Sequence, residues 1–268
     1  MAPVRLASCS PFNISALYTY NSEIMLSDQF LVEMRLDRAR VPGFDAYPFS
    51  LNAVKNLDTL ALHKSVTFII GENGSGKSTL LEAMAVAWGF NAEGGTQNFR
   101  FDTKESQSSL HDYVQLSRSY KKPKNGYFLR AESFYNVATE IDELDKHPGG
   151  RPIIHSYGGT SLHAQSHGES FLALLMNRFS GDGFYILDEP EAALSPTRQM
   201  SALARIHQLA RDGAQFVIST HSPILMAYPD AWIYSLDDDD ITRITYEETE
   251  HYQVCLLYTS DAADEGVE

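Results

Sequence analysis

The chain has 268 residues, 43% of them hydrophobic, which is enough apolar material for one large or two small folded domains. Its formal net charge of −14 disfavours broad adhesion to nucleic acid or anionic lipid. No stretch reaches ~18 consecutive apolar residues and no basic segment precedes an apolar one at the N-terminus, so we expect a cytoplasmic protein without a membrane span or signal peptide. Cys9 and Cys255 are far apart and lack the spacing of a disulfide framework or a zinc site.

The two ends of the chain differ from the rest. Residues 1–27 have no hydrophobic period, and we expect them to be a leader. Residues 255–268 resemble a translated transposase adapter from sequencing libraries, and we expect them to be a non-native tail. Residues 28–254 are expected to form a single α/β domain, in which a β-rich section over 28–70 comes first and a helical insertion occupies about 91–180.

The most informative stretch lies within residues 66–90. Apolar residues over 66–70 run into the sequence GENGSGKS, and an amphipathic segment follows over 79–88, which predicts a strand, a loop and a helix in that order. Glycines let such a loop turn tightly and direct its N–H groups at phosphate oxygens. A glycine turn with a surface lysine is the alternative, but both flanks suit a phosphate-binding loop. The expected binding residues are Gly71, Glu72, Asn73, Gly74, Ser75, Gly76, Lys77, Ser78 and Thr79.

Two side chains of this loop have specific expected roles. Lys77 is expected to reach the β- and γ-phosphates of a nucleotide as a catalytic residue, and the Ser78 hydroxyl to bind Mg²⁺. Upstream of the loop, Tyr47 and Phe49 are candidates for stacking on an adenine ring, and core packing is at least as good an interpretation of either.

The region after the loop predicts a mixture of helices and a strand. The apolar residues within 110–120 have helical spacing, so we expect a helix there. Residues 126–134 predict a strand that ends in polar residues, and residues 136–150 predict a helix closed by proline and glycine.

A group of small polar residues precedes a second apolar helix pattern over 171–179. Ser166 and Gly168 belong to this group. Small polar residues at a helix N-terminus expose N–H groups and a hydroxyl, which suits an anion and equally suits an ordinary N-cap. The residues alone leave both interpretations open.

Two acidic residues end the next apolar run. Residues 184–187 predict a buried strand, and Asp188 and Glu189 follow at its carboxyl end, where parallel α/β sheets bind their ligands. Asp188 is expected to hold Mg²⁺, usually through water, and Glu189 to orient and polarise the attacking water.

The last predicted strand of the core covers residues 215–219 and is followed by His221. At the end of a parallel strand His221 could contact the γ-phosphate, although a lone histidine is more often structural. The aspartates at 237–240 lie between two apolar stretches and predict a solvated hairpin turn, with metal binding as a minor alternative.

Taken together, these motifs resemble the ATP-binding-cassette (ABC) ATPases, in particular the stand-alone branch related to the SMC and RecF proteins and a group of bacterial predicted AAA-family ATPases. GENGSGKST resembles the Walker A motif, YILDEPE the Walker B motif with its catalytic glutamate, and STHSP the switch-histidine segment. The resemblance implies a P-loop fold with an ABC-like core, an N-terminal antiparallel β section and an inserted helical subdomain. It also implies ATP and Mg²⁺ as cofactors.

The same resemblance implies an ATP-dependent, head-to-tail homodimer. QSHGES stands at the place of the family signature, so Ser166 and Gly168 would bind the γ-phosphate held by the other subunit. Residues 193–195 would correspond to the D-loop that crosses the dimer interface.

This sequence departs from the family pattern at several positions. His167 and Glu169 stand where the signature usually has glycine and glutamine, and Ser195 replaces the usual D-loop aspartate. No glutamine stands at an obvious Q-loop position, and Glu132 is our candidate substitute.

We therefore expect an ATPase whose nucleotide-driven dimerisation acts on an unknown partner. One alternative is an ATP-binding subunit of a membrane transporter. Another is a nucleotide-gated adaptor in DNA maintenance or phage defence, although the acidic net charge does not support a nucleic-acid partner.

Overall fold

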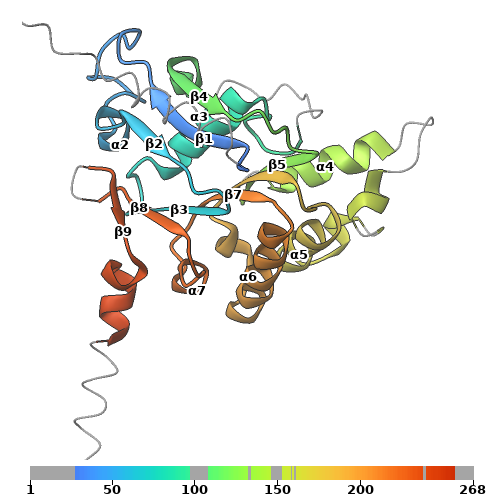
Figure 1. Ribbon diagram of the computed structural model, residues 1–268. Helices are drawn as coiled ribbons and strands as arrows, with labels where there is room; N and C mark the ends of the chain where they lie inside the picture. The colour runs from blue at the N-terminus through green and yellow to red at the C-terminus, as the bar shows by residue number, and fades with distance from the viewer. Residues whose placement is uncertain are drawn as a thin grey trace, which may run out of the picture.

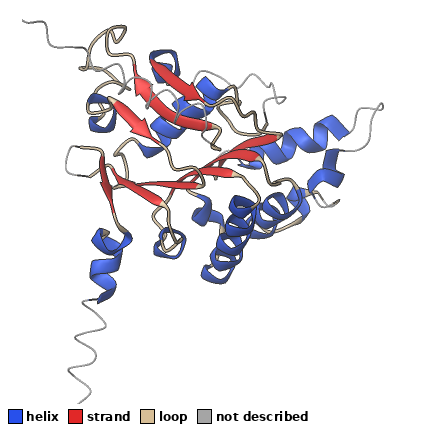
Figure 2. Cartoon of the chain, viewed as in Figure 1, coloured by secondary structure: helices blue, strands red, loops and turns tan. Residues whose placement is uncertain are grey.

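Two β-sheets and the helices around them form the protein (Figures 1 and 2). The computed structural model describes residues 28–96, 108–131, 134–145, 153–157, 159, 161–237 and 240–256. The expected leader and most of the expected tail lie outside these residues.

The smaller sheet is antiparallel and has the strand order β2-β1-β4. Met34 of β1 pairs with Leu60 of β2 on one side and with Leu116 of β4 on the other. The sequence-based prediction of an N-terminal antiparallel β section is thus confirmed. The strands are β1 (Leu31–Leu36), β2 (Thr59–Ala61) and β4 (Val114–Arg118).

The larger sheet contains the phosphate-loop strand and has the order β5-β6-β7-β3-β8-β9. Its first five strands are parallel, and β9 pairs antiparallel at the edge. All residues of β3, β6 and β7 are buried, as expected of central parallel strands covered on both faces. The strands are β5 (Asn125–Arg130), β6 (Gly183–Asp188), β7 (Gln215–Ser219), β3 (Val66–Ile70), β8 (Trp232–Ser235) and β9 (Thr242–Ile244).

Helices cover both faces of the larger sheet. The helix after the phosphate loop, α3, packs between the two sheets, whereas α5 and α6 pack together on the opposite face (Figure 1). The helices are α2 (Asn52–Lys55), α3 (Lys77–Trp88), α4 (Phe134–Asp145), α5 (His167–Asn177), α6 (Pro196–Arg211) and α7 (Pro223–Met226). Short 3₁₀ helices are η1 (Ser109–Tyr113), η2 (Ile153–Tyr157), η3 (Leu162–Ala164), η4 (Pro190–Ala193) and η5 (Tyr246–Glu248).

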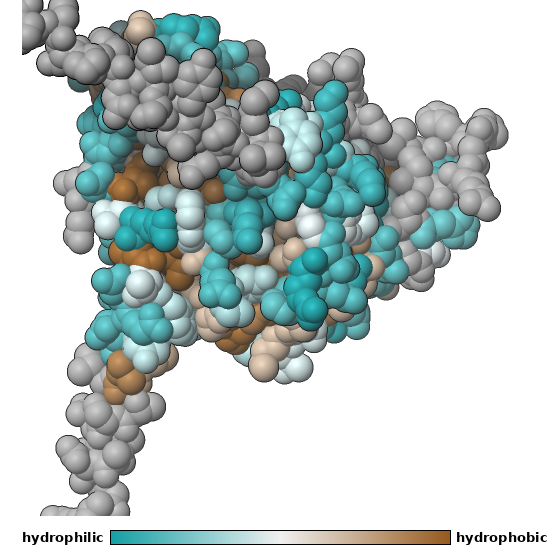
Figure 3. Space-filling view, viewed as in Figure 1, coloured by the Kyte–Doolittle hydropathy of each residue, from teal (hydrophilic) through white to brown (hydrophobic). Residues whose placement is uncertain are grey.

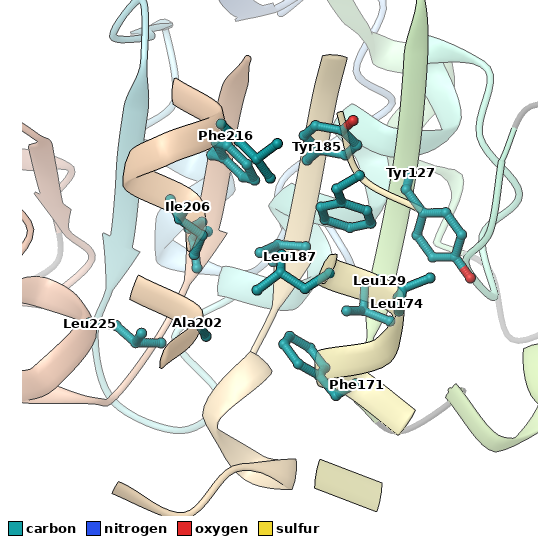
Figure 4. Packing of buried hydrophobic residues seen from close by; sticks show 14 of the residues in the cluster. Tyr127, Leu129, Phe171, Leu174, Tyr185, Leu187, Ala202, Ile206, Phe216 and Leu225 are labelled. Carbon is teal, nitrogen blue, oxygen red and sulfur yellow. The ribbon is translucent and has the colours of Figure 1, made fainter. Parts of the chain in front are cut away.

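Two hydrophobic cores lie on opposite faces of the larger sheet, because side chains alternate along each strand. Tyr185 and Leu187 of β6 point into the core formed with α5 and α6 (Figure 4). Phe184 and Ile186 of the same strand point into the core shared with α3 and the antiparallel sheet. On the face shown in Figure 3, hydrophilic residues predominate and the hydrophobic ones form small separate patches.

One predicted element is wrong. The expected helix over 110–120 is instead the end of η1 followed by strand β4. The apolar positions there suit a helix period, but pairing with β1 takes precedence over this local pattern. The region 91–180 therefore supplies strands β4 and β5 as well as helices, and the predicted domain boundaries stay a prediction.

Two further predictions concern the rest of the chain. The hairpin predicted around residues 237–240 is confirmed by the antiparallel pairing of β8 with β9. Across the described residues, no helix combines the length and the apolar character that crossing a membrane requires.

Candidate nucleotide-binding site

The phosphate loop turns from β3 into α3 through three glycines with positive φ. Gly71, Gly74 and Gly76 have φ angles of 145°, 85° and 103°, in the region that residues with a Cβ rarely adopt. Gly76 is the N-cap of α3, so Lys77 is the first residue of the helix. The predicted strand, loop and helix are thus confirmed, and the helix N-terminus faces the loop as an anion site requires.

Lys77 lies against the first turn of this loop. Its Nζ donates to the carbonyl oxygens of Gly71 and Glu72 at 2.8 and 2.9 Å, and the residue is only 3% exposed. Burial lowers the pKa of Lys77 from its ordinary value, while the nearby carboxylates of Glu189 and Asp188 oppose that shift. The ammonium is therefore held at the mouth of the loop, close to acidic residues.

Asp188 collects hydrogen bonds at the carboxyl end of β6. Its Oδ1 accepts from Ser78 Oγ at 3.0 Å and from Ser219 Oγ at 2.6 Å. Its Oδ2 lies 3.6 Å from Arg130 Nε. Burial raises the pKa of the Asp188 carboxyl, and the Ser219 hydrogen bond, the Arg130 charge and the Ser78 hydrogen bond oppose the rise.

The oxygen atoms at this point fit a magnesium ion. Ser78 Oγ, in the first turn of α3, and Asp188 Oδ1, at the carboxyl end of β6, are 3.0 Å apart. Mg²⁺ prefers oxygen ligands and is usually bound by one or two protein groups together with substrate phosphates. Among the described residues no cluster of three or more His, Cys, Asp or Glu could hold a metal by itself.

Glu189 and His221 face each other across neighbouring strands. Glu189 Oε1 lies 3.5 Å from His221 Nε2, and both side chains are about one-third exposed. Glu189 has a left-handed backbone with φ of 50°, and its N–H donates to Ser219 O at 3.2 Å and to Ser219 Oγ at 3.0 Å. A strained backbone held by its surroundings is typical of functional positions.

The two aromatic candidates upstream of the loop have different surroundings. Tyr47 is 64% exposed, and its hydroxyl lies 3.5 Å from Thr79 Oγ1. Phe49 is 5% exposed and packs edge-on against Tyr113 at a ring distance of 4.9 Å. Phe49 is thus a core residue, and stacking on adenine stays a prediction for Tyr47.

Ser166 and Gly168 lie at the N-terminus of α5. Ser166 forms a capping box with Glu169, whose Oε2 accepts from Ser166 N at 3.0 Å and from Ser166 Oγ at 2.7 Å. These bonds hold the pKa of Glu169 below its ordinary value. Arg198 of α6 contacts both partners, at 3.3 Å from Ser166 Oγ and 3.2 Å from Glu169 Oε1.

Within one chain these contacts make Ser166 a helix cap. Its side-chain contacts are with Glu169 of α5 and Arg198 of α6, so the structure does not bring Ser166 and Gly168 onto the phosphate loop of the same subunit. Glu132, the candidate Q-loop residue, lies outside the described residues.

Sequence reasoning missed Asp237, which was expected to lie in a solvated turn. Its Oδ1 accepts from the N–H of Glu72 at 3.0 Å, and its Oδ2 accepts from Ser235 Oγ at 2.6 Å. The position of Asp237 just after an apolar strand is the signal that could have found it, since the strand is parallel to β3.

A cleft of about 1080 Å³ opens between the phosphate loop and the β8–β9 hairpin. The loop residues on one side and the residues around η5 on the other line it, and His221 and Asp237 lie at its wall. The phosphate loop, the acidic end of β6 and this cleft together form the arrangement of a P-loop nucleotide-binding site.

Comparison with known families gives two adjacent matches. Residues 43–154 match the model described as "AAA domain", and residues 155–227 match the model described as "AAA domain, putative AbiEii toxin, Type IV TA system".

Curated relatives with similar sequences include ABC and SMC proteins. The chain is 24% identical over 183 residues to ABC transporter G family member STR2 of Medicago truncatula, covering 59% of this chain and 24% of that protein. It is 32% identical over 138 residues to the chromosome partition protein Smc of Mycolicibacterium paratuberculosis, covering 49% of this chain and 11% of that protein. It is 25% identical over 213 residues to the ribose import ATP-binding protein RbsA of Bacillus cereus, covering 70% and 40%. The chain thus spans about a quarter of the STR2 relative's length.

Among solved structures, the chain matches the SMC head domain from Thermotoga maritima, with a TM-score of 0.42, 16% identity and coverage of 81% of this chain and 99% of that one. A nucleotide-free ATP-binding cassette from an ABC transporter gives a TM-score of 0.46, 16% identity and coverage of 85% and 95%. The chain is thus similar to AAA domain models over residues 43–227 and, over part of its length, to ABC and SMC proteins.

Proposed function

We propose that the protein binds ATP with Mg²⁺ and hydrolyses it, and that ATP drives two copies into a head-to-tail dimer that acts on a partner. The observation that carries the proposal is the meeting of three strand ends. The Ser78 hydroxyl after β3 bonds Asp188 of β6 at 3.0 Å, and Glu189 lies 3.5 Å from His221, which follows β7.

The chain's own groups divide the work of hydrolysis. The loop amides and Lys77 bind the phosphates, and Ser78 and Asp188 would hold Mg²⁺, which when bound neutralises charge on the phosphate oxygens. Glu189 orients a water for attack on the γ-phosphorus and accepts its proton, and His221 contacts the γ-phosphate beside it. Cleavage of the bond between the β–γ bridging oxygen and the γ-phosphorus then gives ADP and phosphate.

The proposed dimer gives Ser166 and Gly168 a second role. In it, the α5 N-terminus of one subunit meets the γ-phosphate bound by the partner subunit's Lys77. Residues 193–195 would lie at the same interface. Glu169 already accepts the two Ser166 hydrogen bonds, so it has to release them when the phosphate arrives.

Two alternatives follow from the relatives. The name of RbsA favours an ATP-binding subunit of a transporter, and the names of Smc and the AbiEii-type model favour an adaptor in DNA maintenance or defence. We also propose a cytoplasmic location for the protein, as expected from its sequence. The net charge of −14 gives no support to a nucleic-acid partner.

The test compares the protein with Glu189→Gln, measuring ATP turnover and mass in solution with and without ATP. Glutamine keeps the size of the side chain but cannot accept the proton, so turnover should fall by about 100-fold or more while ATP stays bound. The variant should become a dimer with ATP. Glu247→Gln, an exposed position with the same chemical change, is the control and should behave as the unchanged protein.

Normal turnover by Glu189→Gln would refute the role of this carboxylate. A monomer under all conditions would refute the dimer and leave Ser166 as a helix cap.

A further inference from the structure

The position of His221 depends on how its backbone is held. His221 lies beyond the end of β7, and Thr220, which donates to Ile69 O at 3.2 Å, is the last residue bonded to β3. The N–H of His221 instead donates to Glu191 Oε1 at 2.5 Å. The Glu191 side chain thus accepts the kind of main-chain hydrogen bond that a neighbouring strand accepts within the sheet.

Glu191 can link the two segments because it is close in the chain to Glu189, the predicted catalytic glutamate. It lies in η4, two residues after Glu189, and the η4 helix turns the chain sharply after β6. The Glu191 carboxylate therefore fixes the segment with His221 relative to the segment with Glu189. The side chains of His221 and Glu189 are 3.5 Å apart.

A second link binds the same two segments. Ser222 Oγ donates to Gln199 Oε1 at 2.5 Å, and Gln199 Nε2 donates to Leu194 O at 3.0 Å. Residues 221 and 222 are both held by the chain that runs from η4 into α6.

The other oxygen of Glu191 is also informative. Glu191 Oε2 is buried and has no hydrogen-bond partner among the residues that the structure describes. A buried acceptor without a partner costs about 1–3 kcal/mol and calls for an explanation. Because the unpartnered Oε2 lowers the stability of the fold, the hydrogen bond from His221 N to Glu191 Oε1 is the better explanation for a glutamate at this position.

We propose that Glu191 is a positioning residue of the hydrolytic centre, whose carboxylate holds the His221 main-chain N–H and so keeps the imidazole against Glu189. This inference rests on the proposed function for its effect on turnover. Its structural part, the hold on His221, does not depend on hydrolysis.

The test compares Glu191→Ala with Glu191→Gln, because glutamine keeps an acceptor oxygen and alanine does not. Glu191→Ala should lower kcat by about 10- to 100-fold through misplacement of His221, with the ATP Kd changed less than about twofold. Glu191→Gln should keep kcat within about threefold of the unchanged protein. In a His221→Ala background, Glu191→Ala should lower kcat no further.

Amide hydrogen exchange of His221, measured without nucleotide, separates the two proposals. Glu191→Ala should lose protection at this amide while its melting temperature shows that it is folded, and Glu191→Gln should keep it. Unchanged protection in Glu191→Ala would overturn the inference, as would an equal loss of kcat in both variants or full additivity with His221→Ala. If the unchanged protein had no turnover, the proposed function would fail. The hydrogen-exchange result would still decide whether Glu191 holds the His221 N–H.

Discussion

Replacing Gln215 by leucine should strongly destabilise the protein, because this one buried side chain joins the two sheets. Gln215 is the first residue of β7, yet its Oε1 accepts from the N–H groups of Phe30 and Leu31 at 2.9 Å each. Its Nε2 donates to the carbonyls of Leu31 and His63 at 2.8 and 2.9 Å. Gln215, Phe30 and Leu31 are fully buried, so water cannot replace these bonds.

The magnitude follows from the two amides that Gln215→Leu leaves without this acceptor. Each unsatisfied buried group costs about 1–3 kcal/mol, which gives a loss of about 2–6 kcal/mol in the free energy of unfolding. For a domain of this size the melting temperature should fall by roughly 5–20 °C.

Thermal and urea unfolding followed by circular dichroism measure the Gln215→Leu effect directly. Gln253→Leu makes the same chemical change at an exposed position and should shift the free energy of unfolding by less than about 0.5 kcal/mol. A loss below about 1 kcal/mol in Gln215→Leu would refute the reasoning that these hydrogen bonds hold the sheets together.

Two further substitutions test charges in the structure. Asp237→Asn keeps an acceptor for the Glu72 N–H but removes a negative charge near Lys77, so the ATP Kd should fall roughly threefold to tenfold, most clearly at low salt; a titration showing no change would exclude an electrostatic role. Hydrogen bonds from Lys124 and Lys121 lower the pKa of Asp182, so its contribution to stability is present above the ordinary aspartate pKa of about 3.9 and is lost as the pH falls through the lowered value. Asp182→Asn should therefore lower the melting temperature at pH 7, and the difference should disappear in acid; a difference independent of pH would contradict this sign.

The parts of the fold that the sequence predicted are those whose chemistry is local. The phosphate loop needs glycines at positions with positive φ, and the central strands need continuous apolar runs, so β3, α3, β6 and β7 could be read directly. Strand β4 could not, because residues 110–116 suit a helix period. What decides their structure is the pairing of Val114 with Leu36 and of Leu116 with Met34, about 80 positions away in the chain.

The site shows the same division between local and distant information. Lys77, Ser78, Asp188 and Glu189 stand in motifs whose spacing reveals them. Asp237 stands in no such motif, and it contacts Glu72 of the phosphate loop across 165 positions of sequence. Such a contact exists only because β8 lies beside β3 in the sheet.

The groups around Asp188 show why the site can tolerate a buried carboxylate. Burial alone opposes the charged form, but the hydroxyls of Ser78 and Ser219 and the guanidinium of Arg130 favour it. Arg130 is itself anchored by Glu82 of α3 at 2.8 Å, so the same contact fixes the helix that follows the phosphate loop. Ser78, Ser219 and Arg130 come from α3, β7 and β5, so the groups that favour the charged form of the buried Asp188 meet only where these elements are assembled around β6.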